Sequence, residues 1–346
     1  MKPLQISSAT IMAFCALSYG SLTPVTANAA PKLEGSVEAL PRSVDLTSQG
    51  PADWAHWGFE DTPDFGFNHK AGVLQQISDF THLGEKLRRF QDARASYSWD
   101  DGTPQSAASG VTQGVFSVIS GDDETGGFEF TVNASTSERL LKVYLGGFRA
   151  TGHLSATLSD GSAAAFTADF QGASVFDQVV ALRFEAASDD QSLTIRYDFD
   201  DTDVPLPNPG NISLTAATLE RSVAMDIRPF SRVNFVFPRF RGAMPVAILT
   251  TSVAAGDDFD FDAAQVDIDT IAFGPNGATP LWGRSWSYDV DGDGDADRVF
   301  ALGTKSSGIA CGDNDATLTG LTFSGDSFFG TDDIRTFGCH RHRRRR

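Results

Sequence analysis

Five aspartates occupy every second position of the stretch DVDGDGDAD, Asp289 to Asp297, with glycines at 292 and 294. Two carboxylates about 4 Å apart repel by about 1 kcal/mol in water and several-fold more near a protein surface, so this loop needs a compensating cation. Calcium takes roughly six to eight oxygen ligands, and a glycine at the sixth loop position permits the tight turn around it. We therefore predict a Ca2+ site with the ligands Asp289, Asp291, Asp293, Asp295 and Asp297.

The segments around this loop differ from those of an EF-hand. An EF-hand places Glu at the twelfth loop position, where this chain has Phe300, and its flanks are helices, whereas these flanks alternate like strands. The spacing resembles the calcium turns of integrin-type and dockerin-type loops, which implies that Asp295 binds through its carbonyl. The remaining ligands are water or a second acidic stretch, GDDFDFDAAQVDID, for which a charged turn is an equal alternative. Its candidate ligands are Asp258, Asp260, Asp262, Asp267 and Asp269.

The charge of the chain limits its partners. A net charge of −18 argues against general nucleic-acid binding, which needs a basic face, and fits a protein that binds divalent cations. The exception is the basic tail, Arg341 to Arg346. It is predicted either to contact an anionic surface polymer or lipid headgroups, or to be a solvated end.

The first residues, 1–29, have the features of a signal peptide: Lys2, a short apolar run and the small residues of TANAAP. No other segment reaches the roughly 18 apolar residues of a membrane span. We expect a secreted protein, extracellular or periplasmic. In an oxidising compartment the two remaining cysteines, Cys311 and Cys339, are predicted to form a disulfide, with two separate buried thiols as the alternative.

Short alternating segments fill the rest of the chain and predict an all-β fold. The segments of the first half are FEFTV, LKVYL, HLSATLS, VVALRF, LTIRY and ISLTA, separated by turn clusters such as SDGS and VPLPNPGN. Only residues 82–95 could form a helix, and Gly84 weakens that interpretation. The pattern restarts near 219–221 with VAMDIRPF, RVNFVF, MPVAIL, VDIDTIAF and DRVFAL.

These patterns predict a jelly-roll β-sandwich followed by a second, smaller β-sandwich that carries the calcium loop. The expected divisions are a signal peptide at 1–29, a linker at 30–43, a jelly-roll domain at 44–220, a calcium-binding β-domain at 221–340 and a basic tail at 341–346.

Two resemblances support this division. Residues 223–339, with VAMDIRPFSRVN, MPVAIL, DVDGDGDADRVF and SGIACGDNDATLTGLTF, resemble a β-domain recurrent in secreted bacterial proteins, which implies an extracellular accessory module. Such domains usually start with DIKPGS, so Phe230 stands where they have glycine. Residues 44–219, with VDLTSQGPADWAHWG, YSWDDGTP and LKVYLGGFRATGHLSATLSDGS, resemble a galactose-binding-like jelly roll, which implies a carbohydrate-binding type of sandwich.

An aromatic cluster in the first domain is a candidate sugar site. Sugars stack their C–H faces on aromatic rings while polar groups bond the hydroxyls. The candidates are Trp54, Trp57, His69, Trp99 and Asp101. The alternative is that the tryptophans are core residues whose N–H groups bond backbone carbonyls.

Catalysis is not expected. His56, several serines and many carboxylates supply the residue types of a hydrolase, but no G-x-S-x-G, H-E-x-x-H or paired Glu motif occurs. We therefore expect a secreted, non-catalytic, calcium-binding protein that binds a polysaccharide or cell-surface glycan. The alternatives are a purely structural matrix component and a secreted hydrolase.

Overall fold

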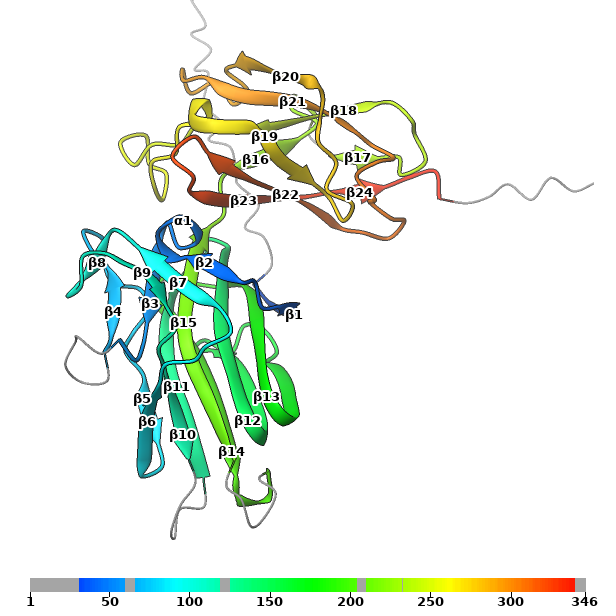
Figure 1. The fold of residues 1–346 in the computed structure, drawn as a ribbon. Coiled ribbons are helices and arrows are strands. Elements are labelled where there is room, and N and C mark those ends of the chain that lie inside the picture. The colour runs from blue at the N-terminus through cyan, green and yellow to red at the C-terminus, as the bar shows by residue number, and fades with distance from the viewer. Residues whose placement is uncertain (1–30, 60–65, 119–124, 204–209, 232, 340–346) are drawn as a thin grey trace, which may run out of the picture.

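The computed structural model describes residues 31–59, 66–118, 125–203, 210–231 and 233–339. The strands form two lobes, one above the other (Figure 1). The N-terminal lobe contains β1 to β15, residues 32–221, and the C-terminal lobe contains β16 to β24, residues 225–336. Within the described residues, no helix has the length and apolar character needed to span a membrane. The predicted signal peptide and basic tail lie outside the described residues.

The N-terminal lobe is a β-sandwich with a single short helix, α1 (Leu46–Gln49). Its strands are β1 (Lys32–Ala39), β2 (Ser43–Asp45), β3 (Asp53–His56), β4 (Asn68–Lys70), β5 (Thr81–Leu83), β6 (Lys86–Phe90), β7 (Ser96–Trp99), β8 (Gly102–Thr103), β9 (Ala108–Val111), β10 (Gly114–Val118), β11 (Thr125–Ala134), β12 (Arg139–Leu158), β13 (Phe166–Glu185), β14 (Gln191–Asp200) and β15 (Asn211–Arg221). A 3-10 turn, η1 (Asp201–Asp203), follows β14.

The long strand β12 connects the two layers of this sandwich. Its first half pairs with β15 and its second half with β14, while β13 follows it along most of its length. The register shifts between Phe148 and Ala150, where Arg149 has φ +50°. A bulge of this kind lets one strand bend from one sheet into the other.

Alternation along the strands builds the core. In β14, Leu193, Ile195, Tyr197 and Phe199 are buried, and the residues between them are partly exposed. The main core lies between the two layers. A smaller aromatic core lies on the other face of one layer, where the small sheet β2-β7-β9 packs against it. The predicted all-β sandwich is therefore confirmed.

The C-terminal lobe contains a four-stranded sheet, β16-β18-β21-β20, and a three-stranded sheet, β19-β22-β23, which pack around a second core. Its strands are β16 (Met225–Ile227), β17 (Phe235–Val236), β18 (Ala243–Ile248), β19 (Val266–Phe273), β20 (Pro280–Tyr288), β21 (Asp297–Gly303), β22 (Asp315–Thr322), β23 (Ser327–Asp333) and β24 (Arg335–Thr336). The 3-10 turn η2 (Ala263–Gln265) precedes β19, and β17 pairs with β24 in parallel.

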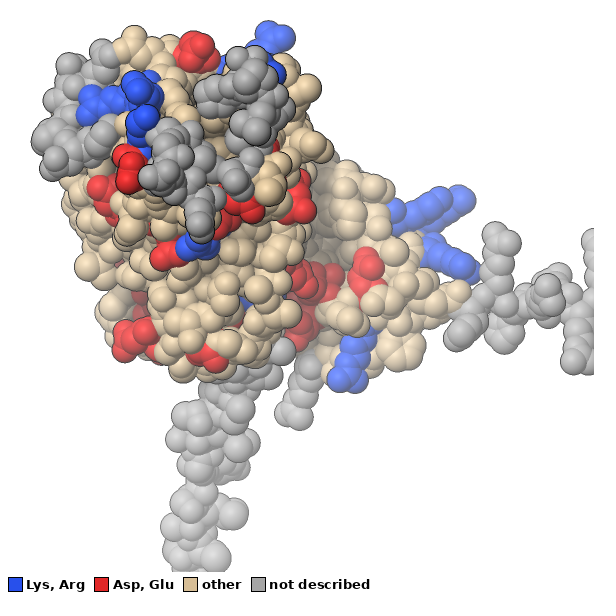
Figure 2. Space-filling view, turned by 90° about the horizontal axis from the view of Figure 1, so that it is seen from below, with Lys and Arg blue, Asp and Glu red and all other residues tan. Residues whose placement is uncertain are grey.

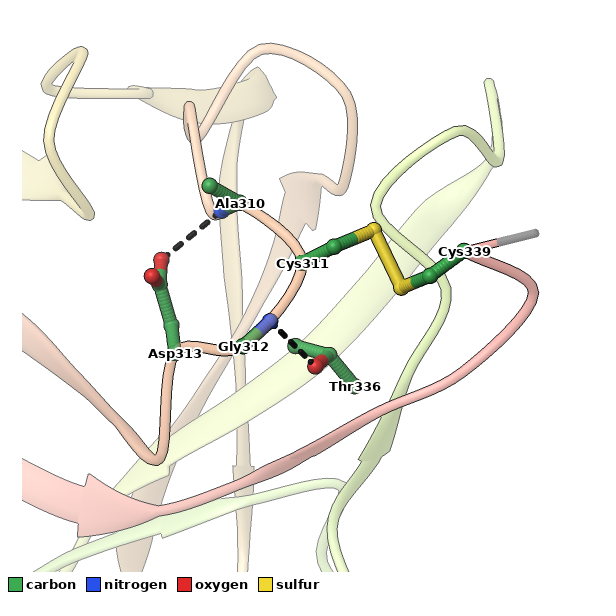
Figure 3. Close-up of a disulfide and its surroundings, with 6 residues drawn as sticks. All are labelled: Ala310, Cys311, Gly312, Asp313, Thr336 and Cys339. Carbon is green, nitrogen blue, oxygen red and sulfur yellow. Dashed lines mark hydrogen bonds between the residues drawn. A yellow bond between two sulfur atoms is a disulfide. The ribbon is translucent and has the colours of Figure 1, made fainter. Parts of the chain in front are cut away.

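A disulfide closes the C-terminal lobe. Cys311 and Cys339 are bonded, with 5.8 Å between their Cα atoms, so the predicted pairing is confirmed (Figure 3). Beside it, the Gly312 amide donates to Thr336 Oγ1 at 3.0 Å. The bond therefore ties the end of the described chain to the loop between β21 and β22.

Two expectations about local structure are wrong. Residues 32–39, expected within a linker, form β1, which pairs along its whole length with β13 and thereby extends the sandwich. Residues 82–95, which could have formed a helix, contain parts of β5 and β6, and Gly84 turns the chain between them at φ +102°. In both cases pairing with a strand that is distant in sequence outweighs the local conformational propensity.

Candidate functional site

The aspartate loop joins β20 to β21 and brings three of its carboxylates together. Oxygens of Asp289, Asp291 and Asp297 lie within 4.8 Å of one another. Asp297 is buried at the start of β21, and the other two are exposed. These three side chains could hold a metal ion.

Backbone amides fix this arrangement. Asp297 accepts from the Thr250 amide at 2.9 Å and from the Val290 amide at 2.7 Å, so its carboxylate ties the loop to the end of β18. Asp289 accepts from the Gly292 amide at 2.8 Å. Gly292 itself has φ +84°, a conformation that favours glycine and permits the tight turn.

The other two predicted ligands do not join this trio. Asp293 accepts from the Asp295 amide at 3.0 Å. Asp295 Oδ1 is inaccessible to solvent and accepts no hydrogen bond within the described residues. A bound cation could satisfy such an oxygen. Burial, followed by the negative charge of Asp293, raises the pKa of Asp295 to about 6, and burial also raises the pKa of Asp291. The donor set fits a hard divalent cation.

The second acidic stretch does not supply additional ligands. Asp260 accepts from the Val253 amide, Asp262 from the Ala264 amide and Asp267 from the Asp269 amide, while Asp258 accepts from Ser137. Among the described residues, only the trio in the loop converges within metal-binding distance. The structure thus favours the charged-turn interpretation of this stretch.

The predicted sugar platform is part of the core. Trp54 and Trp57 are completely buried and Trp99 is 3% exposed. Their N–H groups donate to Asp101, Asp79 and the Gln105 carbonyl at 2.8, 3.0 and 2.9 Å. Protein covers these rings, so they cannot stack on a sugar in the folded state.

The polar candidates of that platform also have structural partners. Asp101 accepts from Thr47 and Trp54 and forms an ion pair with Lys70. Burial opposes ionisation of Asp101, but these donors hold the pKa of its carboxyl below the usual value. His69 stacks on Phe67 with 5.3 Å between ring centroids. The contacts of Asp101 connect the segments that carry Thr47, Trp54 and Lys70 beside the small aromatic core.

A different surface of the N-terminal lobe is open. It lies on the sheet face that carries the small aromatic core, beyond the part that β2, β7 and β9 cover, and crosses the paired strands β13, β12, β15, β10 and β6 in that order. We call this hollow of about 540 Å3 the sheet groove. It is lined by Phe90, Asp92, Ala93, Arg94, Phe116, Gly147, Phe148, Val175, Asp177, Asn211 and Ser213.

Pairing explains how residues distant in sequence meet in the sheet groove. Asp177, Gly146, Ser213 and Phe116 are successive cross-strand neighbours, so they lie on one face of the sheet. Gly146 keeps the floor low, because a Cβ there would lie 2.5 Å from Asp177 Oδ1 and 2.4 Å from a backbone oxygen.

The groove combines rings with polar groups. Phe148 is 37% exposed at its edge and is the cross-strand neighbour of Asn211. Asp177 Oδ2 lies 3.5 Å from Arg94 Nε and has no hydrogen-bond donor within the described structure. Burial raises the pKa of the Asp177 carboxyl, and Arg94 opposes that shift.

Sequence reasoning did not find this groove. Its one local signal is the pair Gly146 and Gly147 before Phe148, because glycines inside a strand often mark a place where a ligand or another backbone comes close. The remaining lining residues come from four other strands and from the loop between β6 and β7, and only the tertiary fold places them beside one another.

Comparison with known proteins gives little further information. No family model matches the chain, and no curated protein matches it. Among solved structures, TmCBM61 in complex with β-1,4-galactotriose matches 42% of this chain and 90% of its own, at 13% identity and a TM-score of 0.27. The glycoside hydrolase domain of Spr0440, Endo-D from Streptococcus pneumoniae R6, matches 74% of this chain and 37% of its own, at 10% identity and a TM-score of 0.15. Both scores are too low to determine fold or function.

Proposed function

We propose that this chain is a secreted, non-catalytic glycan-binding protein whose N-terminal lobe binds a polysaccharide or cell-surface glycan in the sheet groove. The observation that carries this proposal is the open row of phenylalanine rings and polar side chains across five strands. Rings offer flat apolar faces to sugar C–H groups, while Asp177, Asn211 and Ser213 offer hydrogen bonds to hydroxyls.

In this proposal Ca2+ has a structural role. An ion held by Asp289, Asp291 and Asp297 would offset two of the negative charges of the loop and hold β20, β21 and the end of β18 in place. Because only the folded loop gathers the three carboxylates, binding would add to the free energy of unfolding. The loop lies in the C-terminal lobe, so the ion would not contact a glycan in the sheet groove.

The proposed absence of catalysis is supported by the histidines of the described residues. His56 is completely buried, and burial lowers its pKa to about 3. His153 bonds Asp169 and Asp203, at 2.8 and 3.1 Å, and no serine hydroxyl bonds its ring in the described structure. Neither arrangement provides a base beside a nucleophile. His82 Nε2 does lie 2.9 Å from Ser117 Oγ, but that hydroxyl is completely buried and accepts from the Gly127 amide, so a substrate cannot reach it.

A glycan array tests the proposal. The full chain, labelled and held in millimolar calcium, should bind a defined set of oligosaccharides. Phe148→Ala should weaken binding about tenfold or more, because a ring that stacks on the ligand is lost. Phe323→Ala, which truncates an exposed ring in the C-terminal lobe, is the matched control and should bind normally.

Three results would contradict the proposal. An array without any bound glycan would favour the purely structural alternative. Equal loss of binding in Phe148→Ala and Phe323→Ala would show that the sheet groove is not the site. Turnover of a polysaccharide or ester substrate by the wild-type chain would favour the hydrolase alternative.

A further inference from the structure

Five phenylalanines on one face of the C-terminal lobe are exposed to solvent. Phe230 is 71% exposed and Phe240 is 58% exposed, and the other three lie between 36% and 48%. Arg228 lines a hollow between these rings, and Arg335 is the cross-strand neighbour of Phe235. Arg239 and Arg241 flank Phe240 in the sequence. We call this surface the Phe-Arg face; it consists of Phe230, Phe235, Phe237, Phe240, Phe337, Arg228, Arg239, Arg241 and Arg335.

The fold assembles this face from two distant segments. β17 and β24 pair in parallel, which places Phe235 opposite Arg335. The Phe235 and Phe337 rings meet edge to face, 4.8 Å apart. A hollow of about 540 Å3 lies between Phe230, Phe235, Phe237 and Phe240. The Cys311–Cys339 bond holds the residues after β24 at this place (Figure 3).

The two chain segments that form this face carry no acidic residue of their own. No Asp or Glu stands between Asp226 and Asp257, and none follows Asp333. These two stretches are the ones that pair as β17 and β24. Figure 2 shows arginine and lysine side chains gathered at the outer end of the more distant lobe. The chain continues from Cys339 with seven further residues outside the described ones, five of them arginine.

The backbone at Phe230, whose ring is exposed, has a conformation that bulky residues disfavour. Phe230 has φ +72° and Arg228 has φ +64°, in the left-handed region that bulky residues rarely adopt. Strained residues persist where the surrounding structure holds them, and they gather at binding sites. Here the strained residue is also the most exposed ring of the face.

We propose that the Phe-Arg face docks on the surface of an anionic phospholipid bilayer. Exposed apolar side chains rimmed by cations match the boundary between acyl chains and headgroups, where rings are buried and arginines meet phosphates. The arginines of this face are complementary in charge to anionic headgroups, so a chain of net charge −18 would approach the bilayer with this end. This role is independent of the sheet groove, which lies in the other lobe.

Vesicle sedimentation with the full chain tests the proposal. Vesicles of phosphatidylcholine with about one third phosphatidylglycerol should bind the chain, and pure phosphatidylcholine vesicles should bind it far more weakly. Binding should persist in EDTA, since calcium does not bridge the two surfaces. It should fall as salt rises from about 0.1 to 1 M, because the screening length shortens about threefold.

Matched variants locate the contact. Arg239→Gln should weaken binding about fivefold, the effect of one cation near an anionic surface. Arg88→Gln, which removes an exposed arginine from the N-terminal lobe, is the control and should not weaken it. Phe230→Gly should weaken binding about tenfold while leaving the thermal midpoint unchanged or higher, because glycine relieves the strained backbone. Loss of binding through misfolding would lower that midpoint.

The proposal fails if neither vesicle binds, or if both bind equally. It also fails if binding requires calcium, or if Arg88→Gln weakens binding as much as Arg239→Gln. Retention by a soluble anionic polysaccharide without vesicle binding would assign the face to a polymer instead. A dimer that Phe230→Gly dissociates, again without vesicle binding, would assign it to a second copy of the chain.

Discussion

The sharpest prediction concerns Asp291, which differs from Asp293 in one respect. Both are exposed, and each accepts one backbone amide of the loop, but only Asp291 belongs to the convergent trio. Asparagine keeps the size and an acceptor oxygen at either position. Asp291→Asn therefore removes a ligand charge, and Asp293→Asn is its matched control.

The size of the effect follows from the spacing. Two carboxylates within 4.8 Å of each other repel by at least about 0.9 kcal/mol in bulk water and about 3.5 kcal/mol at an effective dielectric of 20. Calcium at one hundred times its Kd adds about 2.7 kcal/mol to the free energy of unfolding. If losing one carboxylate weakens affinity about a hundredfold, only about 0.4 kcal/mol of that gain remains.

The expected outcome changes sign with the ion. In EDTA, Asp291→Asn should be at least as stable as the wild type, because repulsion in the loop is relieved. In calcium at one hundred times the wild-type Kd it should be less stable by about 1.4 kcal/mol, which is the loss of about 2.3 kcal/mol of calcium stabilisation less about 0.9 kcal/mol of relieved repulsion. Asp293→Asn should retain nearly the whole calcium response. Urea unfolding of the three proteins, with and without calcium, measures these differences.

Two results would refute this reasoning. A wild type whose unfolding is the same in calcium and in EDTA would show that the trio binds no ion. Equal loss of the calcium response in both variants would show that the whole acidic run, and not the three converging side chains, attracts the ion.

Three further predictions concern stability and are all measured by urea unfolding. Replacing Cys311 and Cys339 by alanine should lower the free energy of unfolding by about 3.5 kcal/mol, because the unfolded chain gains the entropy of a loop whose ends are 28 residues apart. An unchanged free energy of unfolding would contradict this prediction. Asp53→Ala should lower the free energy of unfolding by about 3–5 kcal/mol, because it removes a fully buried carboxylate that accepts hydrogen bonds from three backbone amides. A decrease of less than about 1 kcal/mol would be inconsistent with that role. Burial raises the pKa of Glu185 to about 7 and that of Asp226 to about 6, so between about pH 4 and 7 the folded state keeps protons that the unfolded state has lost. Lowering the pH through this range should therefore stabilise the wild type more than the double variant Glu185→Gln with Asp226→Asn. Identical slopes of unfolding free energy against pH in the two proteins would contradict the assignment.

Sequence patterns predicted the features that depend on neighbouring residues. Alternation marked strands such as LTIRY, whose apolar residues Leu193, Ile195 and Tyr197 are buried in β14. The spacing of aspartates and glycines predicted the acidic loop, of which three side chains converge. These features are local, because a two-residue period or a tight turn is encoded within a few positions.

Features that depend on distant pairing were missed or misjudged. Residues 32–39 carry no strong strand signal and become β1 only because β13 offers a free edge. Trp54 and Trp99 have the residue type of a sugar platform, but their burial depends on how β2, β7 and β9 cover the sheet. The sheet groove requires five strands in one order, which no single segment shows.

The most direct test of the proposed function is hydrogen exchange of the full chain, with and without a bound oligosaccharide from the array. The account predicts added protection in the strands that line the sheet groove, around Phe116 in β10, Phe148 in β12, Val175 in β13 and Asn211 in β15, with the C-terminal lobe unchanged. Protection confined to the C-terminal lobe, or to the segments around Trp54 and Trp99, would contradict it.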